Sequence, residues 1–527
     1  MKKLNIFLLS IGVLLAFSSC DTYLDKLPDD RAEVDSKDKV AKLLVDAYPQ
    51  AEGILIQELS SDNVADNGKQ YSTESYIDEM YRFKTPEYES TDSPYAIWDY
   101  GYRGVATANQ ALAAIDKLGD TDELKPYKGE ALLCRALNMF ILSNVFCMAY
   151  DSTKCDTYPG LPYPTTTDQP IKGMTERGTL RELYAHINAD IEEALPLIDD
   201  NAYSIPKYHF NKNAAYAFAA RFNLYYHHYD KAIAYATQCL GSDPTVYLRK
   251  WTNYRTLAGS QDIFNNYIQS SDAANFLLIP SVSIVGRWTE GNWLRYVHND
   301  VITKYETYWA ACPWAYGATS SNDLYQCAHM LYGNAQVTMF PKLFETLEYT
   351  DKVNGIGYPH TVDAYFTGDE TILVRAEAYA LRNGNGDLQK AVDDLNTWAS
   401  TNLEDKDDQM TRPTYTVANL TNYVESVHYA SVTPVEDAER SFRKVLHPQG
   451  FTVAKGSQED IIQVILHARR LTTCFQGMRF QDCKRYGIEY THFVDKEDPI
   501  VFKAGDLRGA IQIPEAVINA GLAANPR

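Results

Sequence analysis

Apolar residues recur at every third or fourth position along eight stretches of the chain, and this spacing predicts amphipathic α-helices. In residues 94–117, for example, one apolar stripe runs from Trp98 through Val105 to Ile115. The pattern therefore predicts a mainly α fold. The expected helices span residues 38–48, 94–117, 126–147, 179–197, 212–227, 230–240, 371–382 and 388–401.

Two of these helices form a pair that follows the 34-residue tetratricopeptide pattern. The spacing of Ala220, Ala232 and Pro244 fits a repeat in which small residues let two helices approach closely. Residues 371–401 resemble a second copy, and the helices 126–147 and 179–197 resemble a third that a loop divides. We therefore expect a tetratricopeptide-like helical repeat scaffold that carries long, irregular, loop-rich insertions.

Two insertions, around residues 60–100 and 280–335, are rich in aromatic side chains. Residues 286–316 hold eight aromatics but few Leu or Ile, and Asn292 and Arg295 lie between them. Aromatic faces stack on sugar rings, while amide and charged side chains hydrogen-bond the hydroxyl groups. This pattern favours a glycan-binding surface. The candidate ligand-binding residues are Tyr71, Tyr76, Trp288, Asn292, Trp293, Tyr296, Trp309 and Trp314.

Other aromatic residues are assigned to packing instead. Trp314 follows a proline and precedes a glycine by three residues, which favours an exposed turn. The alternative for all the loop aromatics is that they fill the space between the insertions or contact a partner protein. The aromatic residues predicted to pack inside helical patterns are Trp98, Tyr102, Trp251 and Trp398.

The first 19 residues are predicted to be a signal peptide. Lys2 and Lys3 precede an apolar run at 6–17. As a helix this run spans about 18 Å, too short to cross a hydrocarbon core of ~30 Å. It ends in small residues before Cys20, as in a bacterial lipobox whose cysteine is acylated. Plain secretion after cleavage near Ser19 is the alternative.

Composition and charge narrow the class of ligand. The chain is 45% apolar and 22% charged, which is typical of globular proteins, and its net charge is −20. Nucleic-acid binding needs a basic face, so no nucleic-acid partner is expected. An acidic surface also disfavours sulfated or uronic-acid-rich glycans, although a local basic patch at Arg287 and Arg295 would overrule this.

The sequence carries no recognisable catalytic or metal-binding motif. HExxH, GxSxG and phosphate-binding GxxxxGKS or GxxxxGKT patterns are all missing. A glycosidase needs only two carboxylates, which 69 acidic residues do not exclude. The cysteines after Cys20 form no CxxC pair, and a disulfide within the pairs Cys147 and Cys155 or Cys312 and Cys327 stays open. We expect no catalytic residue, no cofactor and no metal.

Seven short motifs, in their order along the chain, resemble those of the SusD/RagB family of bacterial surface lipoproteins. The first is the segment 20–28, which starts at the lipidated cysteine, and the last is IQIP at 511–514. Two departures are that Cys483 replaces a leucine and that residues 467–472 differ from the usual ERxxEL. The other motifs are the helix with Trp98, Tyr102 and Asn109, KGEALLCRA at 128–136, GLPYP at 160–164, LVRAEAY at 373–379 and GMRFQD at 477–482.

The resemblance implies a non-catalytic glycan-binding lipoprotein on the surface of the outer membrane. Such proteins capture oligosaccharides or polysaccharide and deliver them to a SusC-like TonB-dependent transporter. The resemblance also implies that residues 20–527 form a single SusD-like domain, held at the membrane only by the lipid on Cys20. A peptide-binding RagB-type uptake component and a purely structural lid of the transporter are the alternatives.

Overall fold

The computed structural model describes residues 33–86, 88–119, 121–167, 176–257, 259–291, 293–315, 329–331, 337–339, 341–403 and 414–527. The predicted signal peptide, Cys20, Asn292 and Cys327 lie outside these ranges. Among the described residues, no helix is both long enough and apolar enough to cross a membrane. The same residues contain no group of three or more His, Cys, Asp or Glu side chains placed to hold a metal ion.

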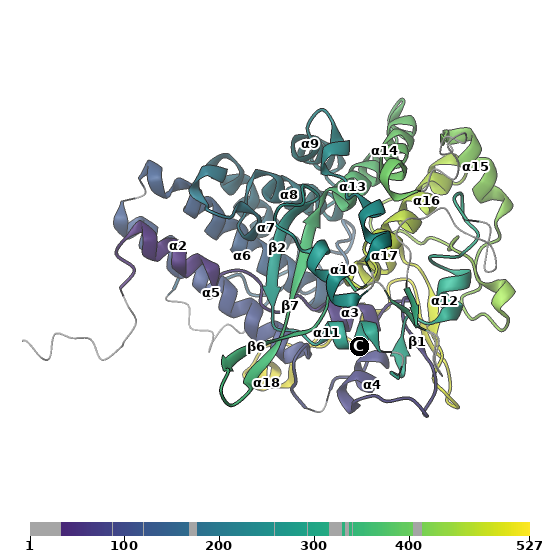
Figure 1. The fold of residues 1–527 in the computed structure, drawn as a ribbon, viewed down its shortest axis with the longest axis horizontal. Helices are drawn as coiled ribbons and strands as arrows, with labels where there is room; N and C mark the ends of the chain where they lie inside the picture. The colour runs from purple at the N-terminus through teal and green to yellow at the C-terminus, as the bar shows by residue number, and fades with distance from the viewer. Residues whose placement is uncertain are drawn as a thin grey trace, which may run out of the picture.

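Paired helices form most of the molecule, as the periodicity predicts (Figure 1). α5 (Pro94–Leu118) packs on α6 (Lys125–Phe146), and α6 packs on α7 (Leu180–Ala194). α8 (Lys212–Tyr225) pairs with α9 (Tyr229–Leu240), which packs on α13 (Gly368–Arg382). α13 in turn contacts α14 (Asp387–Asn402) and α16 (Ser457–Thr472). The mainly α, repeat-like fold class is thus confirmed.

Local signals explain where these helices begin and why they pair closely. Ser93 caps α5 by accepting a hydrogen bond from the Ala96 N–H, and Thr179 forms a capping box at α7 with Glu182. Ala220 and Ala232 are fully buried at the α8–α9 contact. Their small side chains bring the two helix axes together, as the tetratricopeptide pattern requires.

A three-stranded antiparallel sheet lies beside the helices, and helical periodicity does not predict it. Its order is β2 (Asn275–Ser281), β7 (Ile356–Thr367) and β6 (Thr346–Asp351). β7 leads directly into α13, where Thr367 is the N-cap. The far end of the β6–β7 hairpin extends beyond the body of the molecule in Figure 1, and Val353 at its tip is 94% exposed.

Short elements make up the rest of the described chain. Several of them belong to the two insertions. Four of these, α4 (Ser75–Tyr81), β1 (Ala65–Asp66), α11 (Val285–Glu290) and α12 (Asp300–Tyr305), cluster on the lower right of Figure 1. The remaining helices and strands are α2 (Lys37–Val45), α3 (Ile54–Leu59), β1 (Ala65–Asp66), α4 (Ser75–Tyr81), α10 (Ser260–Tyr267), α11 (Val285–Glu290), β3 (Tyr296–Val297), α12 (Asp300–Tyr305), β4 (His329–Leu331), β5 (Val337–Met339), α15 (Val417–Ser426), α17 (Met478–Tyr486), β8 (Tyr490–His492), β9 (Ile500–Phe502) and α18 (Glu515–Asn519).

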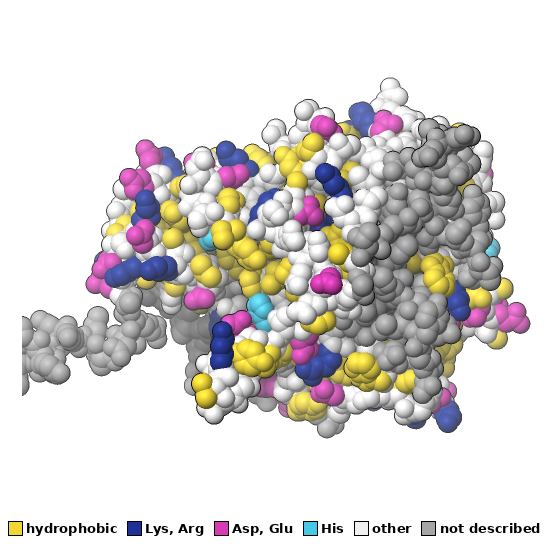
Figure 2. All heavy atoms as spheres, in the orientation of Figure 1, with side chains coloured by type: hydrophobic (Ala, Val, Ile, Leu, Met, Phe, Trp, Pro, Cys, Tyr) yellow, Lys and Arg dark blue, Asp and Glu magenta, His cyan; other side chains and the backbone are white. Residues whose placement is uncertain are grey.

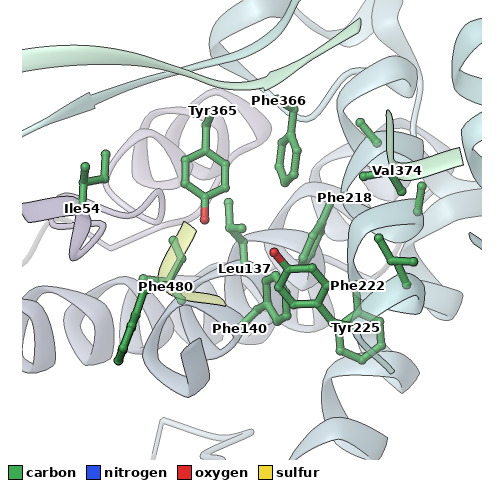
Figure 3. Packing of buried hydrophobic residues seen from close by; sticks show 14 of the residues in the cluster. Ile54, Leu137, Phe140, Phe218, Phe222, Tyr225, Tyr365, Phe366, Val374 and Phe480 are labelled. Carbon is green, nitrogen blue, oxygen red and sulfur yellow. The ribbon is translucent and has the colours of Figure 1, made fainter. Parts of the chain in front are cut away.

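One continuous cluster of buried apolar residues runs from Val40 to Leu522. Figure 3 shows its centre, where Phe140 of α6, Phe218 and Phe222 of α8 and Phe366 of β7 converge. Burial confirms the packing role predicted for four aromatic residues. They are Trp98, Tyr102, Trp251 and Trp398, which are at most 8% exposed.

The described cysteines are all buried free thiols. Cys147 and Cys155, which the sequence left open as a disulfide pair, are therefore not bonded to each other. The second open pair is not tested, because Cys327 lies outside the described residues. Such thiols act as small apolar side chains in the core.

Candidate functional site

The two aromatic-rich insertions join into one structural unit, although their paired strands lie more than 200 residues apart in the sequence. β1 of the first insertion pairs antiparallel with β3 of the second, with Ala65 opposite Val297. The contact continues beyond the strands, since the Ser72 N–H donates to the Trp293 carbonyl at 2.9 Å. The Arg295 N–H donates to the Ser72 carbonyl at the same distance. Backbone pairing therefore fixes Trp293 against the first insertion.

Buried ion pairs reinforce this junction. The Arg295 guanidinium binds both carboxylate oxygens of Asp66, at 2.7 and 2.6 Å, and Asp78 at 3.2 Å. The Tyr296 hydroxyl donates to Asp78 as well. Burial raises the pKa of Asp66, but Arg295 and neighbouring backbone N–H groups outweigh it and lower that pKa. The positive charge of Arg295 is therefore compensated by the carboxylates of Asp66 and Asp78, and these ion pairs hold the two insertions together.

Asp92 forms a second link between the insertions. Its backbone has φ +63°, in the left-handed region, which turns the chain into the N-terminus of α5. Its carboxylate accepts from the Ser283 hydroxyl at 3.0 Å and from the Ile284 N–H at 2.8 Å. Burial raises the pKa of Asp92 to about 6, even though these hydrogen bonds oppose the rise.

The predicted ligand-binding residues fall into two groups. Trp293 is 59% exposed, while Tyr71 and Trp309 are half-buried. Tyr76, Trp288, Tyr296 and Trp314 are at most 4% exposed. A side chain with so little accessible surface offers no face to a ligand, so of the described candidates only the first group can stack on a sugar ring. Asn292 lies outside the described residues.

The expectation of an exposed turn at Trp314 is wrong, because this side chain is only 2% exposed. Its ring stacks on His467 with centroids 5.5 Å apart and packs against Trp398 at 5.2 Å. Both partners belong to helices that are distant in sequence, α16 and α14. Pro313 and Trp314 do lie in a turn, but the Trp314 side chain is buried.

Other buried aromatics of the insertions belong to the continuous apolar cluster. Tyr81 of α4 stacks on Tyr296, with ring centroids 4.2 Å apart, and on His492 of β8, also at 4.2 Å. In this part of the core, aromatic rings fill the space that Leu and Ile side chains fill in the helical scaffold. Most of the candidate aromatic residues in the two insertions are therefore buried, and few are exposed to solvent.

A cavity of about 270 Å³ opens beside this unit, close to the lower end of the range found for ligand pockets. Both insertions line it, the first through 62–66 and Tyr81 and the second through 299–306. Two further segments complete it, namely 431–444 and 489–493. Neither segment belongs to the two aromatic-rich insertions or to the seven family-like motifs, so both went unpredicted.

Buried ion pairs lie at and beside the lining of the cavity. Arg479, in the GMRFQD motif, binds both carboxylate oxygens of Asp62 at 2.7 and 2.8 Å. Glu306 accepts from Lys444 at 2.7 Å and from Arg440 at 2.7 Å. The GMRFQD motif therefore has a structural role here, because its Arg479 compensates the charge of the buried Asp62 carboxylate.

Both of these carboxylates remain ionised. Burial raises the pKa of Asp62, but Arg470 and Arg479 outweigh it and hold the pKa well below its ordinary value. Burial is likewise outweighed at Glu306, where Lys444 and Arg470 lower the pKa to about 2. Glycoside hydrolysis needs one carboxyl that is protonated near neutral pH. The pair of Asp62 and Glu306 does not meet that requirement and is suited to binding.

Comparisons with known proteins agree with this architecture. Residues 22–224 match the family model of SusD-like proteins, which is described as starch-binding and associating with the outer membrane. This match covers the N-terminal part of the chain only. A search of curated proteins found no relative of this sequence.

Solved SusD-like structures share the fold over nearly their whole length. A SusD superfamily protein from Bacteroides fragilis is 16% identical, with a TM-score of 0.61 over 92% of this chain and 97% of that one. A SusD-like carbohydrate-binding protein from Bacteroides vulgatus is 15% identical, with a TM-score of 0.58 over 92% and 97%. A laminarin-binding SusD-like protein is 16% identical, with a TM-score of 0.54 over 93% and 99%.

Proposed function

We propose that this SusD-like protein is a non-catalytic, cell-surface glycan-binding lipoprotein. It is anchored by a lipid on Cys20, captures oligosaccharides or polysaccharide, and delivers them to a SusC-like TonB-dependent transporter in the outer membrane. The observation that carries this proposal is the exposed indole of Trp293, held by backbone pairing at the junction of the two insertions. The family description and the carbohydrate-binding neighbours support the same class of ligand.

Trp293 is suited to stacking on a sugar ring for two reasons. More than half of its surface is accessible (59%), so one face is free to cover the C–H groups of a pyranose. Its backbone is fixed by the hydrogen bond to Ser72, so little conformational entropy is lost when a ligand binds. Tyr71 and Trp309 are the other described candidates with accessible surface, and Asn292 remains a predicted contact.

The peptide-binding alternative has one observation in its favour. β6 is an edge strand of the three-stranded sheet, and Leu347 and Tyr349 on it are 43% and 46% exposed. An extended peptide can add to such an edge by backbone hydrogen bonds. A purely structural lid of the transporter would bind no soluble ligand at either surface.

Affinity electrophoresis of a soluble form that starts at Asp21 tests the proposal. The protein runs through gels that contain plant, host or microbial polysaccharides, and we expect one neutral glycan to retard it. Trp293→Ala should abolish the retardation. Tyr349→Ala is the matched control, since it removes an aromatic side chain of similar exposure from the hairpin and should leave the retardation unchanged.

Two results would contradict the proposal. If no glycan retards the protein, peptide capture or a lid role takes its place. If Tyr349→Ala abolishes retardation and Trp293→Ala does not, the ligand binds at the sheet edge and not at the junction of the insertions.

A further inference from the structure

Trp293 and the 270 Å³ cavity lie at the two ends of one short extended segment. Trp293 precedes β3, and Asn299, which lines the cavity, follows it. At about 3.3 Å per residue, the six steps between these residues span at most about 20 Å. Between them, Tyr296 stacks on Tyr81, which also lines the cavity. One oligosaccharide chain is long enough to contact both places.

The cations that line the cavity are already paired. Arg440 and Lys444 both donate to Glu306, each at 2.7 Å. Asp437 and Glu489 also line the cavity. The Asp437 carboxylate lies 3.7 Å from Nε of Arg440. Glu489 accepts from the Ala504 N–H at 3.1 Å and pairs with no cation among the described residues. An anionic group that entered would therefore meet paired cations and carboxylates that repel it.

The basic patch that the sequence left open is neutralised in the same way. Arg287 binds both oxygens of Glu345, at 3.1 and 2.6 Å, and Arg295 is bound by Asp66 and Asp78. Figure 2 agrees, since positive and negative side chains are interspersed on the visible face and form no broad basic area. Neither arginine is therefore available to attract a sulfated or uronic-acid-rich glycan.

The remaining lining suits a neutral, hydroxyl-bearing ring. Val301, Ile302 and Pro434 present apolar surface, and the Thr491 side chain supplies a hydroxyl group. Carboxylates such as Asp437 and Glu489 accept strong hydrogen bonds from sugar hydroxyls, as they do in many polar sites. Half apolar and half acceptor-rich, the cavity has the mixture that recognises an uncharged sugar.

We infer that the cavity is a second subsite, which takes one neutral sugar unit of the same glycan chain that stacks on Trp293 and rejects uronic acid or sulfated units. This inference rests on the proposed function. It predicts that long oligosaccharides bind through both contacts, while short ones bind through a single contact and therefore more weakly. It also predicts that discrimination against acidic sugars arises at the cavity and not at Trp293.

The test uses oligosaccharides of graded length, released from whichever polysaccharide retards the protein. A second set has the C6 hydroxyl groups oxidised to carboxylates, so the two sets differ only in charge. Ser431 lines the cavity and is exposed, so Ser431→Trp fills the opening without disturbing the core. Ser271→Trp is the matched control, because Ser271 is exposed in the turn before β2.

Calorimetry should show that Ser431→Trp weakens binding of the long neutral oligosaccharides by at least about tenfold, while Ser271→Trp has no effect. The oxidised set should bind the parent protein at least about tenfold more weakly than the neutral set. Glu489→Gln should narrow that gap, since it removes a repelling charge.

The outcomes separate this inference from the proposed function. If a glycan retards the protein but Ser431→Trp binds the long oligosaccharides as tightly as the parent does, the second subsite is wrong and Trp293 alone carries binding. If the oxidised set binds as tightly as the neutral set, the charge discrimination is wrong. If no glycan retards the protein at all, the proposed function fails and the inference falls with it.

Discussion

Asp92 offers a quantitative test of how the two insertions are held together, because its buried carboxylate contacts the backbone of the second insertion. Asp92→Asn keeps one oxygen to accept from the Ile284 N–H, and the new amide group can donate to the Ser283 hydroxyl. The substitution therefore removes the charge with little change in shape. The Glu345 carboxylate repels that charge.

The magnitude follows from the shifted pKa. With a folded pKa of about 6 against an ordinary value of 3.8, ionised Asp92 costs the folded state roughly 3 kcal/mol at pH 7. Below pH about 4 the carboxyl is protonated in both states and costs nothing. Between about pH 4 and 6 the unfolded chain ionises first, so folding stability is lost as pH rises. Above about pH 6 the loss is complete.

Urea unfolding, followed by tryptophan fluorescence at pH 4 and pH 7, measures this effect. Between these pH values, Asp92→Asn should gain about 3 kcal/mol of unfolding free energy relative to the parent protein. Other titrating groups, including Asp62 and Glu306, contribute equally to both proteins and cancel. A difference between the proteins that changes by less than about 1 kcal/mol over this range would refute a raised pKa at Asp92.

Two further predictions concern side chains that the structure places inside. Trp314→Ala should lower the unfolding free energy by about 3–5 kcal/mol, because it empties the space beside Trp398 and His467. At a temperature where the variant is folded, glycan retardation should be unchanged. Loss of retardation in a folded Trp314→Ala protein would show that this residue contacts the ligand after all. Arg479→Met should lower the unfolding free energy of the protein by about 3–5 kcal/mol, since it leaves the Asp62 carboxylate buried beside fewer cations. Adding Asp62→Asn to this variant should recover part of the loss, as measured by urea unfolding. A lack of recovery would mean that Arg479 acts through its packing and not through its charge.

Much of the scaffold was predictable from the sequence because its signals are local. The apolar stripe that includes Trp98 and Ile115 specifies α5, and Ser93 with Pro94 specifies where that helix begins. The spacing of Ala220 and Ala232 predicts the close pair α8 and α9, since a repeat encodes its own contact within a few tens of residues. The β2–β7 pairing escaped prediction, because it joins residues such as Leu278 and Ala364 that are far apart along the chain.

The aromatic enrichment of the two insertions indicated where the candidate site lies but not which side chains face solvent. Tyr296 and Trp293 are three residues apart in the same window, yet one is 1% and the other 59% exposed. Tyr296 is buried because Tyr81 and Asp78, from the first insertion, close over it. No property of the local sequence carries that information.

The sequence by itself determined the repeat scaffold and the two insertions where a ligand surface was to be sought, because periodicity and small-residue spacing are local properties of the chain. Only the tertiary structure decided that Arg287 and Arg295 are neutralised and that segments 431–444 and 489–493 complete a cavity with the insertions. The physical reason is that burial and charge compensation are properties of side chains brought together from distant positions. Those contacts exist only once the chain has folded.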